Sequence, residues 1–593
     1  MYLKRYTVKR GARQYVYLRL VEAFRDDAGG VSHRMLANLG REDLLKSSGQ
    51  LDQLAAAFAL VDPPRIGARR EVGPLLLVKH VLERLELIGL VDRQRPQRGR
   101  AELTTGEVIA ALIANRLCAP APLYDIAAWG AGSALQELLG VPGMLLNDDR
   151  LGRALEAFAP VAEAVRGAVA LAAIESFGTD AARLHLDLTT LRVAGAYESS
   201  SLVAKGWGAD RRVARQVRVL QAVNPEGVPL YVRPHPGDAA ELSCIGAALD
   251  RLAKLLGPGL VVCADSALGH VKNLCSAERA GLRFIVPLRA DTGFAVRFLE
   301  EVGHEGLHSL SYVSQRDRAR SGDERPRYRG ALRPWSVSDP ETGGTRGFRV
   351  LYVWSSEEAE SVAAGREHAL AKAEKDLARI RRGLGGRYYK TVKQVQDRVA
   401  AIQLPAIADL LSITVAVHAG KPTLNWRRNA RAIARVERTD GIYALATNLP
   451  GRISANRLLH TYKAQYLVEQ RHRDAKQTLR VRPLFLHNDD RIQALISVVG
   501  LALTVFGLIE AAVRKALGSG ERLDGLLPEG RDAIPTGRAL LAAFQGLGVT
   551  YTEHRLLLDP LTPTQRRILQ LLHISIPWPE RAELALQNSG KRG

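Results

Sequence analysis

The stretch from Tyr462 to Lys476 places one carboxylate, that of Glu469, within a row of polar side chains. Successive residues of an α-helix are rotated by about 100°, so a helix over this stretch puts five polar residues on one face. These residues are Tyr462, Gln465, Glu469, Arg473 and Lys476. An apolar stripe about a quarter-turn away is suited to packing in a core; it comprises Ala464, Val468, Ala475 and Leu479. The pattern predicts a helix that presents an acid beside two cations and a phenol, although an ordinary solvated helix face has the same composition.

Two aspartates lie in runs that predict β-strands. In RLHLDLTTL, leucines alternate with polar residues that include Asp187, whereas LVVCADS is apolar until Asp265, as in a central strand covered on both faces. The surrounding pattern predicts three strands, a helix, a strand, a helix and a strand. If the fourth strand runs parallel to the first, the two acids come side by side. Taken singly, Asp187 could be a turn-adjacent or capping acid, and Asp265 could cap a helix.

Two neighbouring carboxylates repel each other unless a cation lies between them. Together with Glu469, on a helix packed against the sheet, Asp187 and Asp265 would form an oxygen-rich site for Mg²⁺ or Mn²⁺. Two such ions can activate a water or hydroxyl group and stabilise the leaving oxygen of a phosphodiester. The three acids therefore predict metal-dependent phosphodiester chemistry.

The chain is strongly basic, with a net charge of +21 and a pI near 10.0 over 593 residues. A polyanionic partner such as DNA is the natural inference, although a merely soluble basic surface would give the same totals. The four cysteines form no C-x-x-C pair and have apolar neighbours, which favours reduced thiols in a cytosolic protein. The longest apolar run, residues 494–509, contains small and polar residues and predicts a buried helix rather than a membrane span.

These residues resemble the DDE class of bacterial insertion-sequence transposases, and most closely the IS-four superfamily. That superfamily has a Tyr, two residues, Arg, three residues, Glu, six residues, Lys pattern around its third acid. Tyr462, Glu469 and Lys476 match it at full spacing, and Gln465 stands where Arg is usual. The segments DLT at Asp187, DGIYALATN and RPLFLHNDDRIQALI are also similar. The N-terminal YVYLRLVEAFRD and the later MLANLG resemble the sixteen-thirty-four branch.

The resemblance implies an enzyme that cuts at the ends of its own mobile element and joins the freed 3′-hydroxyl to target DNA. Asp187, Asp265 and Glu469 would ligate two Mg²⁺ (or Mn²⁺) ions. Lys476 and Arg473 would meet phosphates near the scissile bond, and Tyr462 would contact the same strand. The implied partners are double-stranded DNA, as terminal inverted repeats and target, and a second copy in a DNA-bound homodimer. The implied location is the bacterial cytoplasm, with nucleoid association during the reaction.

Two alternatives remain at this point: a ribonuclease-H-like nuclease without strand transfer, and an inactive DNA-binding descendant. Three gathered carboxylates in a basic protein argue against the second, because only chemistry requires them.

The expected fold class is α/β, with a ribonuclease-H-like core of a mixed sheet flanked by helices. Asp265 and Glu469 are 204 residues apart (469 minus 265), against 78 between the aspartates (265 minus 187), so a mixed α/β insertion must interrupt this core. By resemblance, the insertion helps to hold the element end near the metals. The expected domains are a strand-rich module with possible DNA binding (1–62), a helical domain for DNA binding or dimerisation (73–178), the first part of the core (179–295), the insertion (296–450), the second part of the core (451–518) and a C-terminal segment (519–593).

Overall fold

The structure, a computed structural model, describes residues 2–10, 13–25, 30–47, 68–96, 101–195, 197–207, 212–318, 320–402, 407–479, 486, 488–518, 520–552 and 555–581. Residues 48–62 of the expected N-terminal module, most of the RPLFLHN stretch and the last twelve residues lie outside these ranges. The chain divides into two compact units. The smaller unit comprises Met1–Glu71, Leu547–Leu561 and Ile576–Gly593, and the larger comprises Val72–Gly546 and Thr562–Ser575.

The smaller unit contains two three-stranded antiparallel sheets. The first is a three-stranded meander within the module expected to be strand-rich, and Leu18 and Val21 on its middle strand are buried. In the second sheet, β19 from the C-terminal part of the chain pairs with β4 and β20. The elements are β1 (Tyr2–Arg10), β2 (Arg13–Arg25), β3 (Val31–Arg41), α1 (Glu42–Ser47), β4 (Arg69–Glu71), β19 (Gly548–Tyr551) and β20 (Leu556–Leu558).

Helices fill the first part of the larger unit. Thr104 followed by Glu107 before an apolar run predicts a capping box. The box is present at the start of α5, where Thr104 accepts a hydrogen bond from the Glu107 backbone and the Glu107 side chain accepts one in return. Because capping satisfies amides that lack partners within the helix, it fixes the start of this buried helix. The helices are α3 (Leu75–Arg84), α4 (Leu87–Gln94), α5 (Thr105–Cys118), α6 (Ile126–Gly132), α7 (Leu135–Leu139), α8 (Asp148–Phe158) and α9 (Ala162–Phe177).

A ten-stranded mixed sheet forms the centre of the larger unit, in the order β11-β12-β13-β16-β10-β9-β5-β7-β6, with β8 also paired to β7. Its first strands form the predicted antiparallel meander, to which the short β6 is added. The helices α10 and α11 then lead to β9 and β10, which run parallel to β5 and to each other. These elements are β5 (Arg183–Arg192), β6 (Ala204–Trp207), β7 (Val213–Val223), β8 (Pro229–Pro236), α10 (Glu241–Leu256), β9 (Val261–Cys263), α11 (Val271–Arg279) and β10 (Arg283–Pro287).

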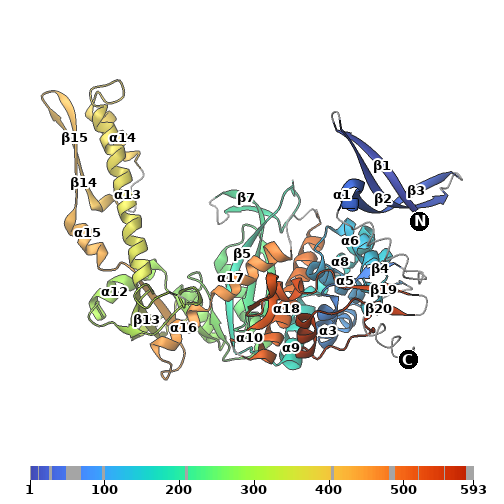
Figure 1. Cartoon of the computed structure of the whole chain (residues 1–593). Coiled ribbons are helices and arrows are strands. Elements are labelled where there is room, and N and C mark those ends of the chain that lie inside the picture. The colour runs from blue at the N-terminus through green and yellow to red at the C-terminus, as the bar shows by residue number, and fades with distance from the viewer. Residues whose placement is uncertain are drawn as a thin grey trace. The chain divides into compact units, whose positions relative to one another are not determined.

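Four strands from the segment 296–450 extend this same sheet. β16 pairs antiparallel with β10 on one side and with β13 on the other. The chain therefore leaves the sheet after β13, forms a separate group of helices and a hairpin (Figure 1), and returns to a position between strands already formed. The elements up to that departure are α12 (Phe294–Glu301), β11 (His308–Leu310), β12 (Tyr328–Ser338) and β13 (Thr345–Ser355), and β16 (Ile442–Thr447) is the return.

Helix α18 (Asp489–Leu517) is the buried helix predicted from residues 494–509, and all of those residues are buried. Within the described part of the chain, two helical runs are long and apolar enough to cross a membrane, 148–177 and 489–517, with 39% and 94% of their most apolar windows buried in the protein. Because core helices of soluble proteins pass the same test, these runs are weak evidence for a membrane. The elements after α18 in this unit are β17 (Leu523–Leu527), β18 (Arg531–Ala533), α19 (Gly537–Ala542) and α20 (Pro563–Leu571).

Two glycines let α18 lie directly on β8 and the turn before it. A Cβ at Gly507 would come within 2.9 Å of the Gly227 carbonyl oxygen and 3.1 Å of the Val228 Cα. A Cβ at Gly500 would meet the Val232 side chain at 2.9 Å. The helix therefore approaches the strand more closely than any other residue would allow at these positions.

Replacing Gly507 with Ala should lower the free energy of unfolding by about 1–3 kcal/mol, because backbone atoms must move to admit the methyl group. Gly365 is a matched control, since it lies within a helix and a Cβ there would meet nothing within 4 Å. Gly365→Ala should instead stabilise the protein by about 0.5–1 kcal/mol. Urea denaturation of both variants measures the difference, and equal effects would contradict the close approach of α18.

Candidate active site

Asp187 and Asp265 come to the same edge of the sheet because β5 and β9 run parallel. The ladder pairs Arg183 with Val261 and His185 with Cys263, so each aspartate lies two residues beyond the same rung. Adjacent strands are about 4.8 Å apart, and residues two apart share a face. Burial raises the pKa of Asp265, and the negative charge of Asp187 raises it further. The two carboxylates are therefore neighbours that repel each other.

Both aspartates are held by further hydrogen-bonding groups. Asp187 Oδ2 lies 3.2 Å from His472 Nδ1, and its Oδ1 accepts from the Leu188 backbone N–H at 2.8 Å. Asp265 Oδ1 accepts from the Ala267 backbone N–H at 3.0 Å. These contacts fix the orientation of each carboxylate where its strand leaves the ladder.

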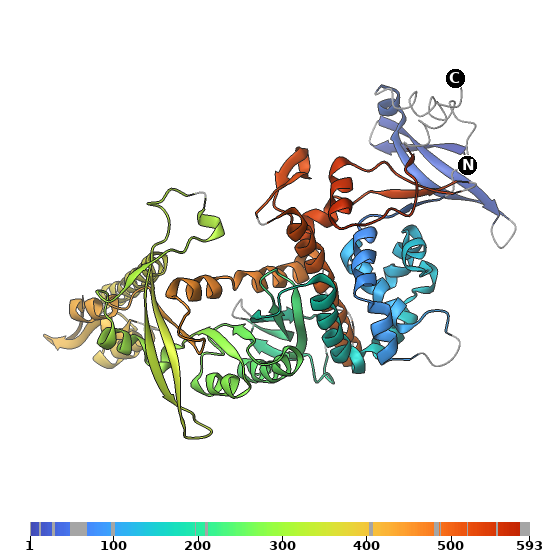
Figure 2. The same ribbon diagram turned by 90° about the horizontal axis from the view of Figure 1, so that it is seen from below.

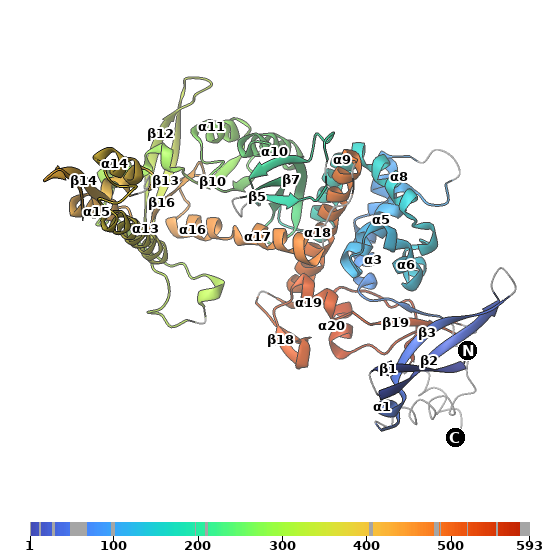
Figure 3. The same cartoon turned by 90° about the horizontal axis from the view of Figure 1, so that it is seen from above.

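The segment around Glu469 is not the single regular helix that its spacing predicts. It forms α16 (Ala455–Lys463), α17 (Tyr466–Arg473) and a π-helical turn, Asp474–Thr478. The helices α16 and α17 lie along the sheet beside β10 and β5, drawn in orange in both the lower view (Figure 2) and the upper view (Figure 3). The prediction of one α-helix is therefore wrong, because contacts with the sheet outweigh the local helical preference at Ala464–Gln465 and again after Arg473.

Gln465 lies toward the sheet and not on the outward face that the helical spacing predicts. Its Nε2 donates to the Leu186 carbonyl oxygen at 2.7 Å, and its Oε1 lies 3.2 Å from His185 Nδ1. Burial lowers the pKa of His185 to about 4, so the neutral ring donates from Nδ1 to this amide oxygen. An arginine could not accept that hydrogen bond. The residue that departs from the superfamily pattern therefore joins the start of α17 to β5.

Glu469 and Arg473 are both exposed on α17. Tyr462, on α16, is half-buried. Burial raises the pKa of Tyr462 to about 12, and the charges of Asp265, Cys263 and Glu469 add to this effect. The phenol is therefore partly shielded from water and is influenced by the charges of both Asp265 and Glu469. The apolar stripe behind it is as predicted, since Val468, Ala475 and Leu479 are buried.

Lys476 lies in the π-helical turn and reaches back to the strand that carries Asp187. Its Nζ donates to Thr189 Oγ1 at 2.6 Å. Thr189 is two residues beyond Asp187 and shares its face. The ammonium group is thus held on the same strand as the first acid.

The sequence analysis missed two ionisable residues of this site, Glu241 and His472. The Glu241 side chain hydrogen-bonds with Asp265, and burial, followed by the charge of Asp265, raises the pKa of Glu241 well above its usual range. A signal for Glu241 was present, because α10 follows β8, and β8 runs parallel to β5. The first turn of α10 must then lie at the edge of the sheet where the strands end. His472 had no such signal, since its contact with Asp187 depends on how α17 crosses β5.

The three predicted acids do not form a complete set of metal ligands in this structure. Among the residues that the structure describes, no three Asp, Glu, His or Cys side chains lie close enough together to hold a metal ion. The charge of Asp187 acts on Asp265, and the charges of Asp265 and Glu469 act on Tyr462. The structure therefore brings the two aspartates together, whereas Glu469 is exposed on α17, which packs against β5.

A buried ionic network lies immediately behind α17. Arg471 is 2% exposed and pairs with Asp474 at 2.9 Å and Glu510 at 3.0 Å. Its Nε donates to the Gly227 carbonyl oxygen at 2.6 Å, and its guanidinium lies 5.2 Å from the ring centroid of Phe506. This one side chain therefore ties the helix bearing Glu469 to α18 and to the turn between β7 and β8.

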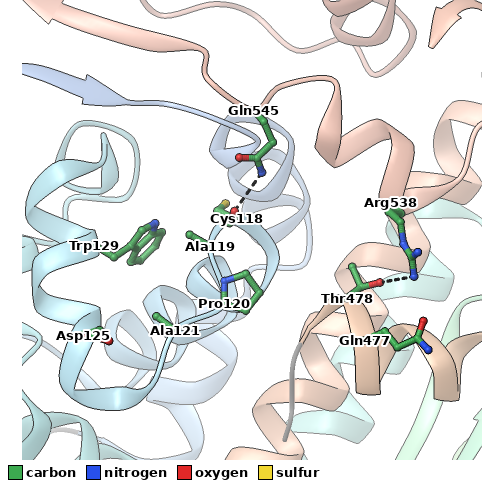
Figure 4. Close-up of a pocket in the computed structure, with 10 residues that line it drawn as sticks. All are labelled: Cys118, Ala119, Pro120, Ala121, Asp125, Trp129, Gln477, Thr478, Arg538 and Gln545. Carbon is green, nitrogen blue, oxygen red and sulfur yellow. Dashed lines mark hydrogen bonds between the residues drawn. The ribbon is translucent and has the colours of Figure 1, made fainter. Parts of the chain in front are cut away.

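A cavity of about 700 Å³ lies on the other side of the π-helical turn, between that turn and the helical region (Figure 4). Arg538 donates to Thr478 on one wall, and Gln545 donates to the Cys118 carbonyl oxygen on the other. Its only carboxylate is Asp125. The cavity therefore does not contain the predicted acids.

Comparison with protein families gives three matches. The model described as "Transposase DDE domain" matches residues 180–505, which is more than half of the chain. The "IS1634 family transposase, N-terminal domain" matches residues 3–61, and a domain of unknown function (DUF4277) matches residues 68–164. A search of curated proteins found no match.

A mixed sheet with acids at one edge and the DDE match over it define a DDE transposase, and the chain belongs to that family. The N-terminal match makes it a transposase of the IS1634 type, from a bacterial insertion sequence. The DDE domain implies a ribonuclease-H-like α/β fold, a DNA substrate and a general dependence on divalent metal. The resemblance inferred from Tyr462, Glu469 and Lys476 is thereby confirmed at the level of family and enzyme class.

Replacing Arg471 with Ala should cost about 3–5 kcal/mol of stability, because it leaves Asp474 buried without its close cation and leaves Glu510 with Arg514 alone. Arg473→Ala, two residues away on the exposed face, should change stability by no more than about 0.5 kcal/mol. Denaturant unfolding of the two variants provides the measurement. A similar small effect for both would mean that the buried network does not hold α17 in place.

Proposed function

We propose that Asp187, Asp265 and Glu469 are the acids that carry the chemistry of this transposase, and that DNA is cut beside them. One observation supports this above all. The two aspartates lie at the same edge of neighbouring parallel strands, and the helix that bears Glu469 packs against the first of these strands, β5, and against β7. An exposed Glu469 and a shielded Asp265 give this edge both an accessible and a protected carboxylate.

The residues fit a hard divalent ion such as Mg²⁺ or Mn²⁺. Carboxylate oxygens are the ligands that these ions prefer. Burial and, after it, the charge of Asp187 raise the pKa of Asp265, and a cation would relieve the second effect. Asp187, Asp265 and Glu469 would hold the two ions. When bound, such ions activate the attacking water or 3′-hydroxyl and stabilise the leaving oxygen.

Three further residues are proposed to bind the DNA strand near the scissile bond. Lys476, held against Thr189, offers an ammonium group to a phosphate next to the first acid. Arg473 is exposed one turn after Glu469 and would contact the same backbone. Tyr462, whose pKa is raised by burial and by the charges of Asp265 and Glu469, would use its hydroxyl to orient the strand or a carboxylate.

We further propose that the substrates are the terminal inverted repeats of the element and a target duplex, bound by a homodimer. The strand-rich module 1–62 and the helical domain 73–178 are the candidate surfaces for end recognition or dimerisation. Segments 179–295 and 451–518 form the two parts of the catalytic core, segment 296–450 holds the element end, and segment 519–593 completes the fold. The reaction takes place in the bacterial cytoplasm, on the nucleoid.

Replacing Glu469 with Gln keeps the shape of the side chain and removes a charged metal ligand. Cleavage of a duplex carrying the element end should fall by orders of magnitude in Mg²⁺. Binding of the same duplex in Ca²⁺ should stay equal or tighten slightly, because one negative charge facing the polyanion is lost. Glu360→Gln removes the same charge from an exposed position on a distant helix and should leave cleavage unchanged. Normal excision by the Glu469 variant would refute the assignment of three acids.

Replacing Lys476 with Ala should weaken both binding and cleavage, because it removes a partner of the DNA backbone. The expected loss in binding is about 1 kcal/mol, or about fivefold in Kd, the size of one charge-assisted hydrogen bond. Filter binding and cleavage assays on the same end duplex measure both effects. If cleavage falls with unchanged affinity at every salt concentration, Lys476 acts on the acids and not on a phosphate.

A further inference from the structure

Residues 356–438 form an arm with a hydrophobic core of its own. It comprises α13 (Ser356–Arg382), α14 (Val392–Ala400), β14 (Leu411–His418), β15 (Lys421–Arg428) and α15 (Ala430–Glu437), which stand together in Figure 1. Leu370, Leu377 and Ile380 of α13 pack with Val395 and Leu424 from the other elements. β14 and β15 pair only with each other in the described sheets. The arm therefore folds around α13 and not as part of the central sheet.

The charge of the arm changes sign along its length. Residues 356–378 contain six Asp or Glu and three Lys or Arg. Residues 379–438 contain thirteen Lys or Arg and three Asp or Glu, a net charge of +10. About a tenth of the chain thus carries nearly half of its net charge of +21. Such a concentration costs self-repulsion unless a polyanion neutralises it.

Some cations of the arm have structural partners. Arg366 pairs with Asp440 at 2.7 Å and fixes the first half of α13 to the segment that returns to β16. Arg428 pairs with both Glu367 and Glu374, at 2.7 and 3.0 Å. The pairs of Arg428 neutralise two acids of α13 and hold the β14–β15 hairpin against that helix.

The cations at the far end of α13 and on α14 differ from these. Arg382, Arg387, Lys390, Lys393 and Arg398 are all exposed, and none has an ion pair within the described part of the chain. The neighbouring residues 403–406, which lie outside the described ranges, contain no charged side chain. Tyr388 is 60% exposed among these cations, with the guanidinium of Arg387 5.6 Å from its ring centroid. We define these six residues as the arm tip.

We propose that the arm tip is a docking surface for the DNA backbone away from the cleavage site. Exposed cations without protein partners fit phosphates, and Arg and Lys contacts to phosphates position DNA without recognising its sequence. Arg382 lies sixteen residues beyond Arg366 on the same helix, about 24 Å at 1.5 Å per residue. That length corresponds to about seven base pairs of duplex. The tip would therefore contact DNA about seven base pairs away from the point at which Arg366 fixes the arm. This inference rests on the proposed function of the chain in binding and cutting DNA.

The test compares two double variants of the full-length protein. Lys390→Gln with Lys393→Gln removes two exposed lysines at the tip. Lys372→Gln with Lys375→Gln removes two exposed lysines with the same spacing from the acidic half of the same arm. The two variants have the same net charge. Each is titrated with a random-sequence duplex of about three helical turns at several salt concentrations.

The tip variant should bind this duplex about tenfold more weakly than the unmodified protein, and its salt slope should fall by about 2, one for each lost phosphate contact. The control variant should match the unmodified protein. On an end duplex cut short just beyond the cleavage site, both variants should cleave normally. Adding Arg382→Gln and Arg387→Gln to the tip variant should lower the slope further.

Equal affinities and salt slopes for the tip and control variants would overturn the proposal. A tip variant that retains DNA affinity and loses self-association in sedimentation would also overturn it, in favour of an acidic surface on a second copy. The two proposals fail separately. If Glu469→Gln still cleaves while the tip variant loses long-duplex binding, the acid assignment falls and the arm assignment stands.

Discussion

Repulsion between carboxylates on adjacent parallel strands is the constraint around which the catalytic half of the molecule is arranged. Because β5 and β9 pair in parallel, Asp187 and Asp265 are neighbours. His472 lies against Asp187 and backbone amides donate to both acids, which moderates that repulsion, whereas Glu241, hydrogen-bonded with Asp265, is a third acid that both aspartates repel. A site whose carboxylates repel one another when it is empty is well suited to binding a cation.

In the same half of the molecule, buried ion pairs hold one helix in place. Arg471 and its partners lie directly beneath the turn of α17 that carries Glu469. Buried ion pairs add little net stability compared with apolar packing, but they specify geometry, because each charge is costly in any other arrangement. Gln465 adds a second, uncharged attachment at the start of α17. The helix is thereby fixed at both ends against β5 and α18.

Local patterns predicted the elements that depend on local physics. The alternating leucines around Asp187, the apolar run before Asp265 and the capping box at Thr104 all correspond to elements of the structure. The break at Gln465 and the π-helical turn at Lys476 could not be predicted, because both arise from contacts with a strand some 280 residues earlier. For the same reason, the position of β16 between β13 and β10 could not be predicted from local patterns. The identities of the site residues came from spacing, whereas their geometry depends on tertiary contacts.

The two ends of the arm meet at a single backbone hydrogen bond, from the Ser355 amide to the Gly441 carbonyl at 3.0 Å. Gly441 has a positive φ of 74°, and a Cβ there would lie 2.6 Å from the Ser355 carbonyl oxygen, so glycine is needed for the close approach. To the sheet, the whole arm is therefore equivalent to a hairpin loop between β13 and β16. Loops whose ends are already joined tolerate large changes in length at little thermodynamic cost. A change in the length of this appendage would therefore leave the register of the strands beneath it unchanged.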